Sequence, residues 1–365
     1  MDRFTTAWFV CVACTVLIFE ISCSIAPVIN SFYYVLARNV FGLIIGHWIF
    51  LFTQGSIFKK HINPNKKAVF ITGCDSGFGF QLAKRMDSKG YHVFAGCLFP
   101  MSGGAAELKS SCSSRFCTVH IDVTQDDSVL NAKEFVEKNL GDCELWAVVN
   151  NAGVYKGSSL EFTPMSNFED SLQVNTLGQV RVTKAFLPLL RRSKGRIVNV
   201  NSLAGRIAVF PMNCYSMSKF AAIAFTTCLR HEVEPFGMKV ISIEPEFFKT
   251  PLTDSENLLK QLETTRANME EKFKSGWDKK QLKGIKRILM FIEKVTSPNT
   301  CYVTDAMEAA VSMQYPCSVY QPCGNTIRQI MYYCVLRLPD HFLDTGIRIL
   351  NVTAPVLWPL YSALL

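Results

Sequence analysis

The chain has 365 residues, 49% of them apolar, and a formal net charge of +8. This apolar content can fill the core of one large α/β domain and excludes a disordered chain. The positive charge lacks the interleaved aromatic residues of a nucleic-acid site, so nucleic-acid binding is not expected. Basic surface beside a membrane would instead suit anionic lipid headgroups.

The first 60 residues are poor in charge. Up to residue 55, the charged side chains are Asp2, Arg3, Glu20 and Arg38. Apolar runs occur at 4–19, 21–36 and 40–58, and two of them approach the roughly 20 residues of a membrane helix. We expect residues 1–60 to be a hydrophobic membrane anchor of one or two helices. A cleaved secretory signal and a mitochondrial presequence are the alternatives, but neither a clean cleavage site nor an arginine-rich amphipathic pattern is present.

Basic residues follow the anchor, namely Lys59, Lys60, His61, Lys66 and Lys67. By the positive-inside rule we expect the main domain on the cytosolic side of a membrane, at the endoplasmic reticulum, with a mitochondrial location as the alternative. The fourteen cysteines lack regular spacing, which fits free thiols in a reducing compartment. No metal site is expected.

Residues 61–325 alternate short β-rich apolar runs with longer helical patterns, the βαβ rhythm of a parallel sheet. Strands are expected at 68–72, 92–97, 117–121, 146–150, 196–201 and 239–243. Helical crossovers are expected at 77–89, 126–139, 167–190 and 213–234. This order predicts a doubly wound parallel sheet, a Rossmann-type α/β fold.

Two further segments follow the sixth expected strand. Residues of about 250–295 are polar and helical, and at this place in the fold they would cover the carboxyl edge of the sheet. We expect a substrate lid there; a solvated helical insertion is the alternative. Residues 326–365 form an apolar C-terminal extension that could dock on a bilayer or pack as a terminal helix.

A glycine-rich turn joins the first expected strand to the first helix. It consists of Thr72, Gly73, Asp75, Ser76, Gly77, Phe78 and Gly79, with Cys74 between them. Glycine lets the backbone approach a pyrophosphate, and the N-terminus of the helix supplies unpaired N–H groups. The turn therefore predicts a dinucleotide site.

Charged residues near this turn favour NAD over NADP. A basic residue after the second strand would meet the 2′-phosphate of NADP, but residues 95–99 contain none. Asp75 would repel that phosphate if it points inward, or could cap the helix instead. Asp122, followed by Val123, is a candidate acceptor for the adenine, and capping of the next helix is its alternative role.

Three asparagines are further candidates for the cofactor site or for catalysis. Asn150 and Asn151, followed by Ala152 and Gly153, end the fourth strand and would line the adenosine side of the cofactor. Asn175 lies within a long expected helix. It could hold a water that relays protons to Lys219, or be a back-bonded structural residue.

Ser202, Tyr215 and Lys219 carry the expected chemistry. Tyr215 and Lys219 are four residues apart, so they share one helical face, and a nearby ammonium favours the phenolate. Ser202 would hydrogen-bond the substrate oxygen, Tyr215 would remove its proton, and hydride would pass to nicotinamide, whose ribose Lys219 would bind. The alternative for any Tyr-x-x-x-Lys is an exposed pair on a helix.

In this order the motifs resemble the short-chain dehydrogenase/reductase family, from about Lys67 to Asp344. Segments such as 94–98 and 186–190 are similar to its branch of retinol, 17β- and 3α-hydroxysteroid, and D-3-hydroxybutyrate dehydrogenases. The resemblance implies that Ser202, Tyr215, Lys219 and Asn175 form a catalytic tetrad, and that the enzyme oxidises alcohols with NAD.

The chain departs from the family pattern after the sixth strand. Pro245 and Thr250 correspond to cofactor-contacting positions, but Glu246 stands where glycine is usual. A glutamate there would bring a side chain and a charge toward the nicotinamide pocket. A milder change is Asn201, in place of the usual serine before Ser202.

We therefore expect a membrane-associated NAD-dependent enzyme that interconverts an alcohol and its carbonyl, with a hydrophobic retinoid or steroid as substrate. D-3-hydroxybutyrate dehydrogenase is the alternative, which would need a cation such as Lys249, Lys260 or Arg266 to pair with a carboxylate. A third hypothesis is a non-catalytic membrane-bound interaction protein whose cofactor site Glu246 has disabled. The family resemblance also implies a homodimer or tetramer.

Overall fold

The computed structural model describes residues 31–43, 60–101, 103–208, 210–267 and 296–336, together with a few single positions elsewhere. The chain divides into two units, Met1–Lys59 and Lys60–Leu365. In the first unit, residues 31–43 form a helix with exposed side chains. No helix among the described residues is long and apolar enough to cross a membrane. Most of the expected anchor, and the C-terminal extension beyond 336, lie outside them.

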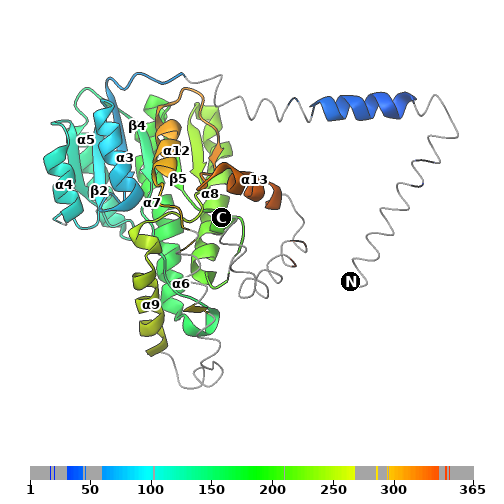
Figure 1. The fold of residues 1–365 in the computed structure, drawn as a ribbon. Helices are drawn as coiled ribbons and strands as arrows, with labels where there is room; N and C mark the ends of the chain where they lie inside the picture. The colour runs from blue at the N-terminus through cyan, green and yellow to red at the C-terminus, as the bar shows by residue number, and fades with distance from the viewer. Residues whose placement is uncertain are drawn as a thin grey trace. The chain divides into compact units, whose positions relative to one another are not determined.

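The second unit is built on a seven-stranded parallel sheet (Figure 1). The strands are β1 (Lys67–Thr72), β2 (His92–Cys97), β3 (Phe116–His120), β4 (Glu144–Asn150), β5 (Arg196–Val200), β6 (Lys239–Ile243) and β7 (Val319–Tyr320). Their order in the sheet is β3-β2-β1-β4-β5-β6-β7. The order reverses between β1 and β4, and folds of this type bind ligands beyond the carboxyl ends of strands at such a point.

Helices connect these strands. They are α3 (Gly77–Ser88), α4 (Gly103–Ser111), α5 (Asp126–Asn139), α6 (Met165–Leu172), α7 (Gly178–Ser193), α8 (Asn213–Val233), α9 (Ser255–Ala267), α12 (Cys301–Ser312) and α13 (Thr326–Val335). A π-helical turn, η2 (Gln173–Leu177), joins α6 to α7. Short 3-10 turns occur at η1 (Leu160–Phe162), η3 (Leu203–Gly205), η4 (Glu234–Phe236) and η5 (Pro251–Thr253).

Both faces of the sheet are covered by helices, which gives two apolar cores. One core contains Leu82 of α3 and Met307 of α12. The other contains Val136 of α5 and Phe186 of α7, and Phe186 stacks on Phe70 of β1 with ring centroids 4.5 Å apart. Burial on both faces explains why the strands read as continuous apolar runs instead of alternating ones.

The predicted doubly wound α/β fold is confirmed, and all six expected strands are present with ends within two residues. The expected helix over 167–190 differs, because η2 interrupts it. Three elements were not predicted from the sequence: α4, α12 and the two-residue strand β7. Helix α9 lies within the segment expected to be a lid.

Candidate active site

The turn after β1 has the shape that a phosphate group requires. Gly73 and Gly77 have φ values of 69° and 63°, a region that favours glycine. A Cβ added to Gly79 would lie 2.4 Å from the carbonyl oxygen of Gly73 and 2.5 Å from Nδ2 of Asn151. Within the described residues, no side chain caps the N-terminus of α3, and its first turn contains no acid. These features fit the pyrophosphate of a dinucleotide.

Hydrogen bonds tie this turn to the end of β4. The Thr72 hydroxyl accepts from the N–H groups of Asn151 and Ala152, each at 3.0 Å. Asn151 Nδ2 in turn donates to the carbonyl oxygens of Thr72 at 2.9 Å and Gly73 at 3.0 Å. The two polar turns expected from the sequence therefore meet at the reversal point of the sheet.

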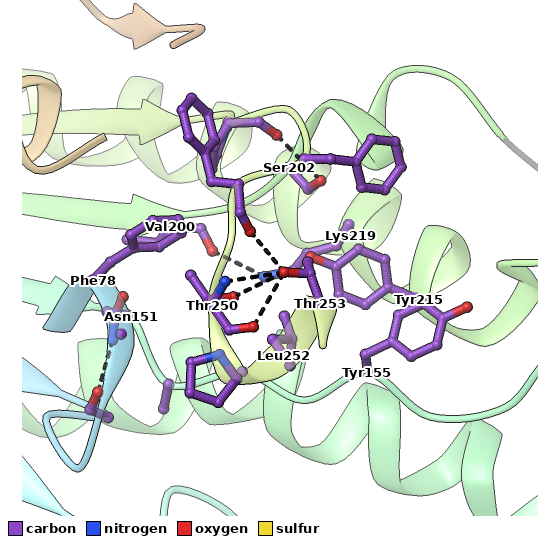
Figure 2. A pocket seen from close by; sticks show the side chains of 18 of the residues that line it. Phe78, Asn151, Tyr155, Val200, Ser202, Tyr215, Lys219, Thr250, Leu252 and Thr253 are labelled. Atoms are coloured by element: carbon purple, nitrogen blue, oxygen red, sulfur yellow. Dashed lines mark hydrogen bonds between the residues drawn. The ribbon is translucent and has the colours of Figure 1, made fainter. Parts of the chain in front are cut away.

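A cavity of about 380 Å³ opens beside these turns (Figure 2). Its lining includes most of the residues expected to bind the cofactor or to react: Gly73, Asp75, Ser76, Gly77, Phe78, Asn151, Ala152, Gly153, Ser202, Tyr215, Lys219, Pro245 and Thr250. Thr72, Gly79, Asp122, Val123 and Asn175 are not part of the lining. Of these five, Thr72 and Gly79 are the first and last residues of the glycine turn, and the Thr72 hydroxyl accepts from Asn151 and Ala152.

Tyr215 and Ser202 reach the cavity from different elements. Tyr215 lies in the first turns of α8 and is only 8% exposed, and Ser202 follows β5. The Ser202 hydroxyl accepts from the N–H of Ala204 at 3.1 Å. Burial raises the pKa of Tyr215 to about 12, although its contact with Ser202 acts in the opposite direction. Burial therefore favours the neutral phenol of Tyr215.

Lys219 lies one helical turn after Tyr215 and is 4% exposed. Its Nζ donates to the carbonyl oxygen of Val200 at 2.9 Å and lies 5.7 Å from the ring centroid of Tyr215. Burial lowers the pKa of Lys219 to about 8. The sequence predicts that this ammonium lowers the pKa of Tyr215. The structure gives a raised pKa for Tyr215 instead, because burial outweighs the hydrogen bond with Ser202.

Asn175 lies on the π-helical turn η2 and is fully buried. Its side chain accepts from the Val154 N–H at 2.8 Å and donates to the Val154 carbonyl oxygen at 2.9 Å. It also donates to the Ser218 hydroxyl at 2.9 Å. A Cβ on Gly153 would lie 3.3 Å from Asn175 Oδ1 and 3.8 Å from Lys219 Nζ. The side chain thus connects the segment after β4 to α8, close to Lys219.

The two acidic candidates have different surroundings. The Asp75 carboxylate accepts from the N–H groups of Leu98 at 3.0 Å and Phe99 at 2.9 Å, so it lies against the chain that leaves β2. Asp122 Oδ1 accepts from the N–H and hydroxyl of Thr124 at 2.9 and 2.7 Å, within its own turn. Asp75 therefore brings its charge to the end of the second strand.

The opposite end of the cavity is apolar and contains residues that were not predicted. Tyr155 lies beside Tyr215 with ring centroids 5.4 Å apart (Figure 2). Met212 and, from α9, Leu258 also line it, and both belong to the same apolar cluster as the two tyrosines. Tyr155 comes two residues after the Asn-Asn-Ala-Gly turn. Its closeness to that motif in the sequence is the signal by which it could have been predicted as a cavity residue.

Residues after β6 close the cavity on its remaining side. The Pro245 carbonyl oxygen accepts from the Leu203 N–H at 3.0 Å, and the Thr250 N–H donates to the Thr253 hydroxyl at 3.0 Å. Glu246 also belongs to the lining, but its side chain is 0% exposed and forms an ion pair with Arg328. Burial raises the pKa of Glu246, while the Gly324 N–H and Arg328 oppose that shift.

Comparisons with known proteins agree with this geometry. The chain is 36% identical to estradiol 17-beta-dehydrogenase 2 of Mus musculus, over 77% of this chain and 75% of that protein. It is 35% identical to retinol dehydrogenase 16 of Mus musculus, over 82% and 93%. It is 49% identical to the mitochondrial D-beta-hydroxybutyrate dehydrogenase of Bos taurus, over 52% of this chain and 57% of that protein.

A comparison with solved structures finds the same fold. A short chain dehydrogenase/reductase of Burkholderia phymatum, solved in complex with NAD, superposes with a TM-score of 0.58 at 21% identity, over 74% of this chain and 93% of that one. The family model for short chain dehydrogenases matches residues 67–260. The chain therefore belongs to the short-chain dehydrogenase family and is a dehydrogenase of that type.

Proposed function

We propose that this protein is an NAD-dependent dehydrogenase of a hydrophobic alcohol, with Ser202, Tyr215 and Lys219 as the reacting set. The observation that carries the proposal is that these three side chains, one from the segment after β5 and two from α8, line one cavity with the glycine turn after β1. The same reaction in reverse would reduce the carbonyl compound.

Each residue has a distinct role in this proposal. Ser202 hydrogen-bonds the substrate oxygen, and Tyr215 exchanges a proton with it. Because the pKa of Lys219 is about 8, this side chain is mostly protonated at neutral pH and its charge favours the phenolate of Tyr215. Bound NAD would supply the hydride acceptor. Asn175 fixes the geometry around Lys219 through its contacts with Val154 and Ser218.

The choice of NAD over NADP rests on Asp75. Its carboxylate lies at the end of β2, and that region of doubly wound folds recognises the adenosine ribose. A negative charge there opposes a 2′-phosphate. Lys219 is the one cation among the described residues that line the cavity, so no basic side chain in this lining is placed to offset that repulsion.

The lining of the cavity also supports an apolar substrate. Tyr155, Met212 and Leu258 surround the end beyond Tyr215. Lys249 and Lys260, which the hydroxybutyrate alternative would require, are not in the lining, and the side chain of Arg266 lies outside the described residues. Relatives that act on estradiol or retinol, by their names, match long stretches of the chain. We therefore propose a steroid or retinoid alcohol.

The hydroxybutyrate alternative keeps one observation in its favour, the 49% identity to a D-beta-hydroxybutyrate dehydrogenase over 196 residues. Membrane association remains part of our proposal because of the apolar composition of residues 1–60. The cytosolic face of the endoplasmic reticulum suits a substrate that partitions into lipid, and a mitochondrial membrane is the alternative. Residues of about 250–295 would form the lid, to which α9 contributes Leu258.

A substrate panel with a base variant tests the proposal. The membrane fraction is incubated with NAD and retinol, an estrogen or androgen alcohol, or D-3-hydroxybutyrate, and NADH formation is followed. We expect activity with a retinoid or steroid; activity with hydroxybutyrate alone would favour the alternative. Tyr215→Phe should abolish turnover but still bind NAD, and retained turnover would refute the assigned base. Absence of thermal stabilisation by either NAD or NADP would favour the non-catalytic hypothesis.

A further inference from the structure

Glu246 follows strand β6 and belongs to the wall of the cavity, and the structure gives it specific partners. Its Oε1 accepts from the backbone N–H of Gly324, and its Oε2 lies 3.0 Å from Nη2 of Arg328. The Glu246 side chain is 0% exposed and that of Arg328 is 10% exposed. This is a buried ion pair between the wall of the cavity and helix α13.

The α13 side of the pair is shaped to receive the carboxylate. A Cβ on Gly324 would lie 2.9 Å from Glu246 Oε1 and 3.2 Å from Arg328 Nη1, so the backbone approaches the pair as closely as only glycine allows. Asn325 caps α13 by accepting from the Arg328 N–H at 2.8 Å. Arginine in the first turn of a helix is opposed by the helix dipole. The facing carboxylate compensates for this unfavourable position.

The backbone that follows Glu246 reaches the glycine turn. Phe248 is buried, and its ring meets that of Phe78 edge to face, with centroids 6.3 Å apart and an interplanar angle of 79°. A Cβ on Gly77 would lie 3.9 Å from the side chain of Thr250. Residues 246–250 therefore connect the ion pair directly to the part of the cavity that fits a dinucleotide.

Ser297 forms two backbone hydrogen bonds with residues 246–250. Its N–H donates to the Phe247 carbonyl oxygen at 2.9 Å, and its carbonyl oxygen accepts from the Lys249 N–H at 2.9 Å. The Glu246 N–H donates to the Pro322 carbonyl oxygen at 3.2 Å. The segment is thus fixed on one side by backbone bonds, and the carboxylate of Glu246 adds an attachment to α13.

We propose that Glu246 and Arg328 are positioning residues for the dinucleotide: their ion pair fixes residues 246–250 against the glycine turn, so α13 contributes to NAD affinity without contacting NAD. The inference rests on the proposed function, because it assumes that NAD occupies this cavity. If the pair instead serves only to attach α13, its loss will lower stability and leave the affinity for NAD unchanged.

The test compares NAD binding in the full-length protein and four variants: Glu246→Gln, Arg328→Met, the double variant, and Arg328→Lys. The dissociation constant for NAD is measured by calorimetry on protein whose folding is verified by circular dichroism. Each single neutral variant should weaken NAD binding roughly tenfold, and the double variant no further than a single one, because both remove the same interaction. Arg328→Lys should recover part of the affinity. In turnover assays KM for NAD should rise, with kcat within about twofold of the wild type.

Arg85→Met is the matched control. Arg85 joins α3 to α12 through Glu308 at 3.4 Å and through Asp305, and it does not line the cavity. It should lower the melting temperature without changing the dissociation constant for NAD. If Arg328→Met does not fold, Glu246→Gln and Arg328→Lys carry the comparison.

Failure of this inference and failure of the proposed function would give different results. Folded Glu246→Gln and Arg328→Met proteins that bind NAD as tightly as the wild type would overturn this inference and leave the proposed function intact. A folded wild-type protein that binds neither NAD nor NADP would refute the proposed function, and this inference with it.

Discussion

Replacement of Lys219 by methionine should make the ligand-free protein more stable. Burial lowers the pKa of Lys219 from 10.5 to about 8. At about 1.36 kcal/mol per pKa unit, holding this ammonium in the fold costs about 3 kcal/mol at neutral pH. Methionine is an unbranched apolar side chain that can fill the space, but the Val200 carbonyl oxygen loses its 2.9 Å donor, which costs about 1 kcal/mol. The net expectation is a gain of about 2 kcal/mol in the free energy of unfolding.

The dependence on pH provides a second check. Below the folded-state pKa both the folded and unfolded states carry the proton, so the full cost is present. Between about pH 8 and about pH 10.5 the unfolded state binds more protons, and the stability of the wild type should therefore rise with pH. Lys219→Met lacks this contribution, so its advantage over the wild type should shrink across that interval.

Urea denaturation of both proteins at about pH 7 and about pH 10 measures these differences. The matched control is Lys184→Met on the exposed surface of α7, which should change stability by no more than about 0.5 kcal/mol. A Lys219→Met protein that is less stable than the wild type at neutral pH would refute the reasoning, as would an advantage that does not shrink with pH. The same variant should lose turnover, so that stability and activity change in opposite directions.

Two further substitutions test the cofactor side of the cavity. Gly79→Ala should weaken NAD binding more than about tenfold and lower stability by about 1–3 kcal/mol, because the new Cβ would lie 2.4 Å from the Gly73 carbonyl oxygen; calorimetry and urea denaturation measure the two effects. Asp75→Ala should raise the ratio of kcat/KM with NADP to kcat/KM with NAD by roughly tenfold, because a carboxylate at the end of β2 repels a 2′-phosphate.

Each substitution has a control elsewhere in the domain. Gly103→Ala places its Cβ where no atom lies within 4 Å and should leave NAD binding unchanged. NAD binding by Gly79→Ala within twofold of the wild type would contradict the steric argument. Asp122→Ala should leave the NADP to NAD ratio unchanged, since adenine is common to both dinucleotides. An unchanged ratio in Asp75→Ala would show that Asp75 does not select the cofactor.

The sequence was most informative where chemistry and local structure depend on the same short segment. The glycine turn and the strand before it were predicted from adjacent residues, and the structure places Ser202, Tyr215 and Lys219 on one cavity, as their order along the chain indicated. Their catalytic roles stay predictions until the variants are measured. The strands were predictable because a sheet covered on both faces requires continuous apolar runs.

What escaped prediction depends on contacts between distant residues. Strand β7 has two residues, too few for a periodic pattern. It forms because the N–H groups of Ser242 and Glu244 donate to the carbonyl oxygens of Ser318 and Tyr320. The π-helical turn at Asn175 reads as ordinary helix in the sequence. Glu246 departs from the family pattern in the sequence itself, but its partner Arg328 lies 82 positions further along the chain, and no local pattern links the two.

The ion pair of Glu246 also has an evolutionary consequence. Glu246, Gly324 and Arg328 fit one another, so a change at one position alters the fitness effect of changes at the other two. Replacement of Glu246 alone by glycine would remove the carboxylate that faces a buried guanidinium, and should thus be harmful unless Arg328 changes as well. Among descendants of this sequence we expect the three positions to be inherited together or replaced together.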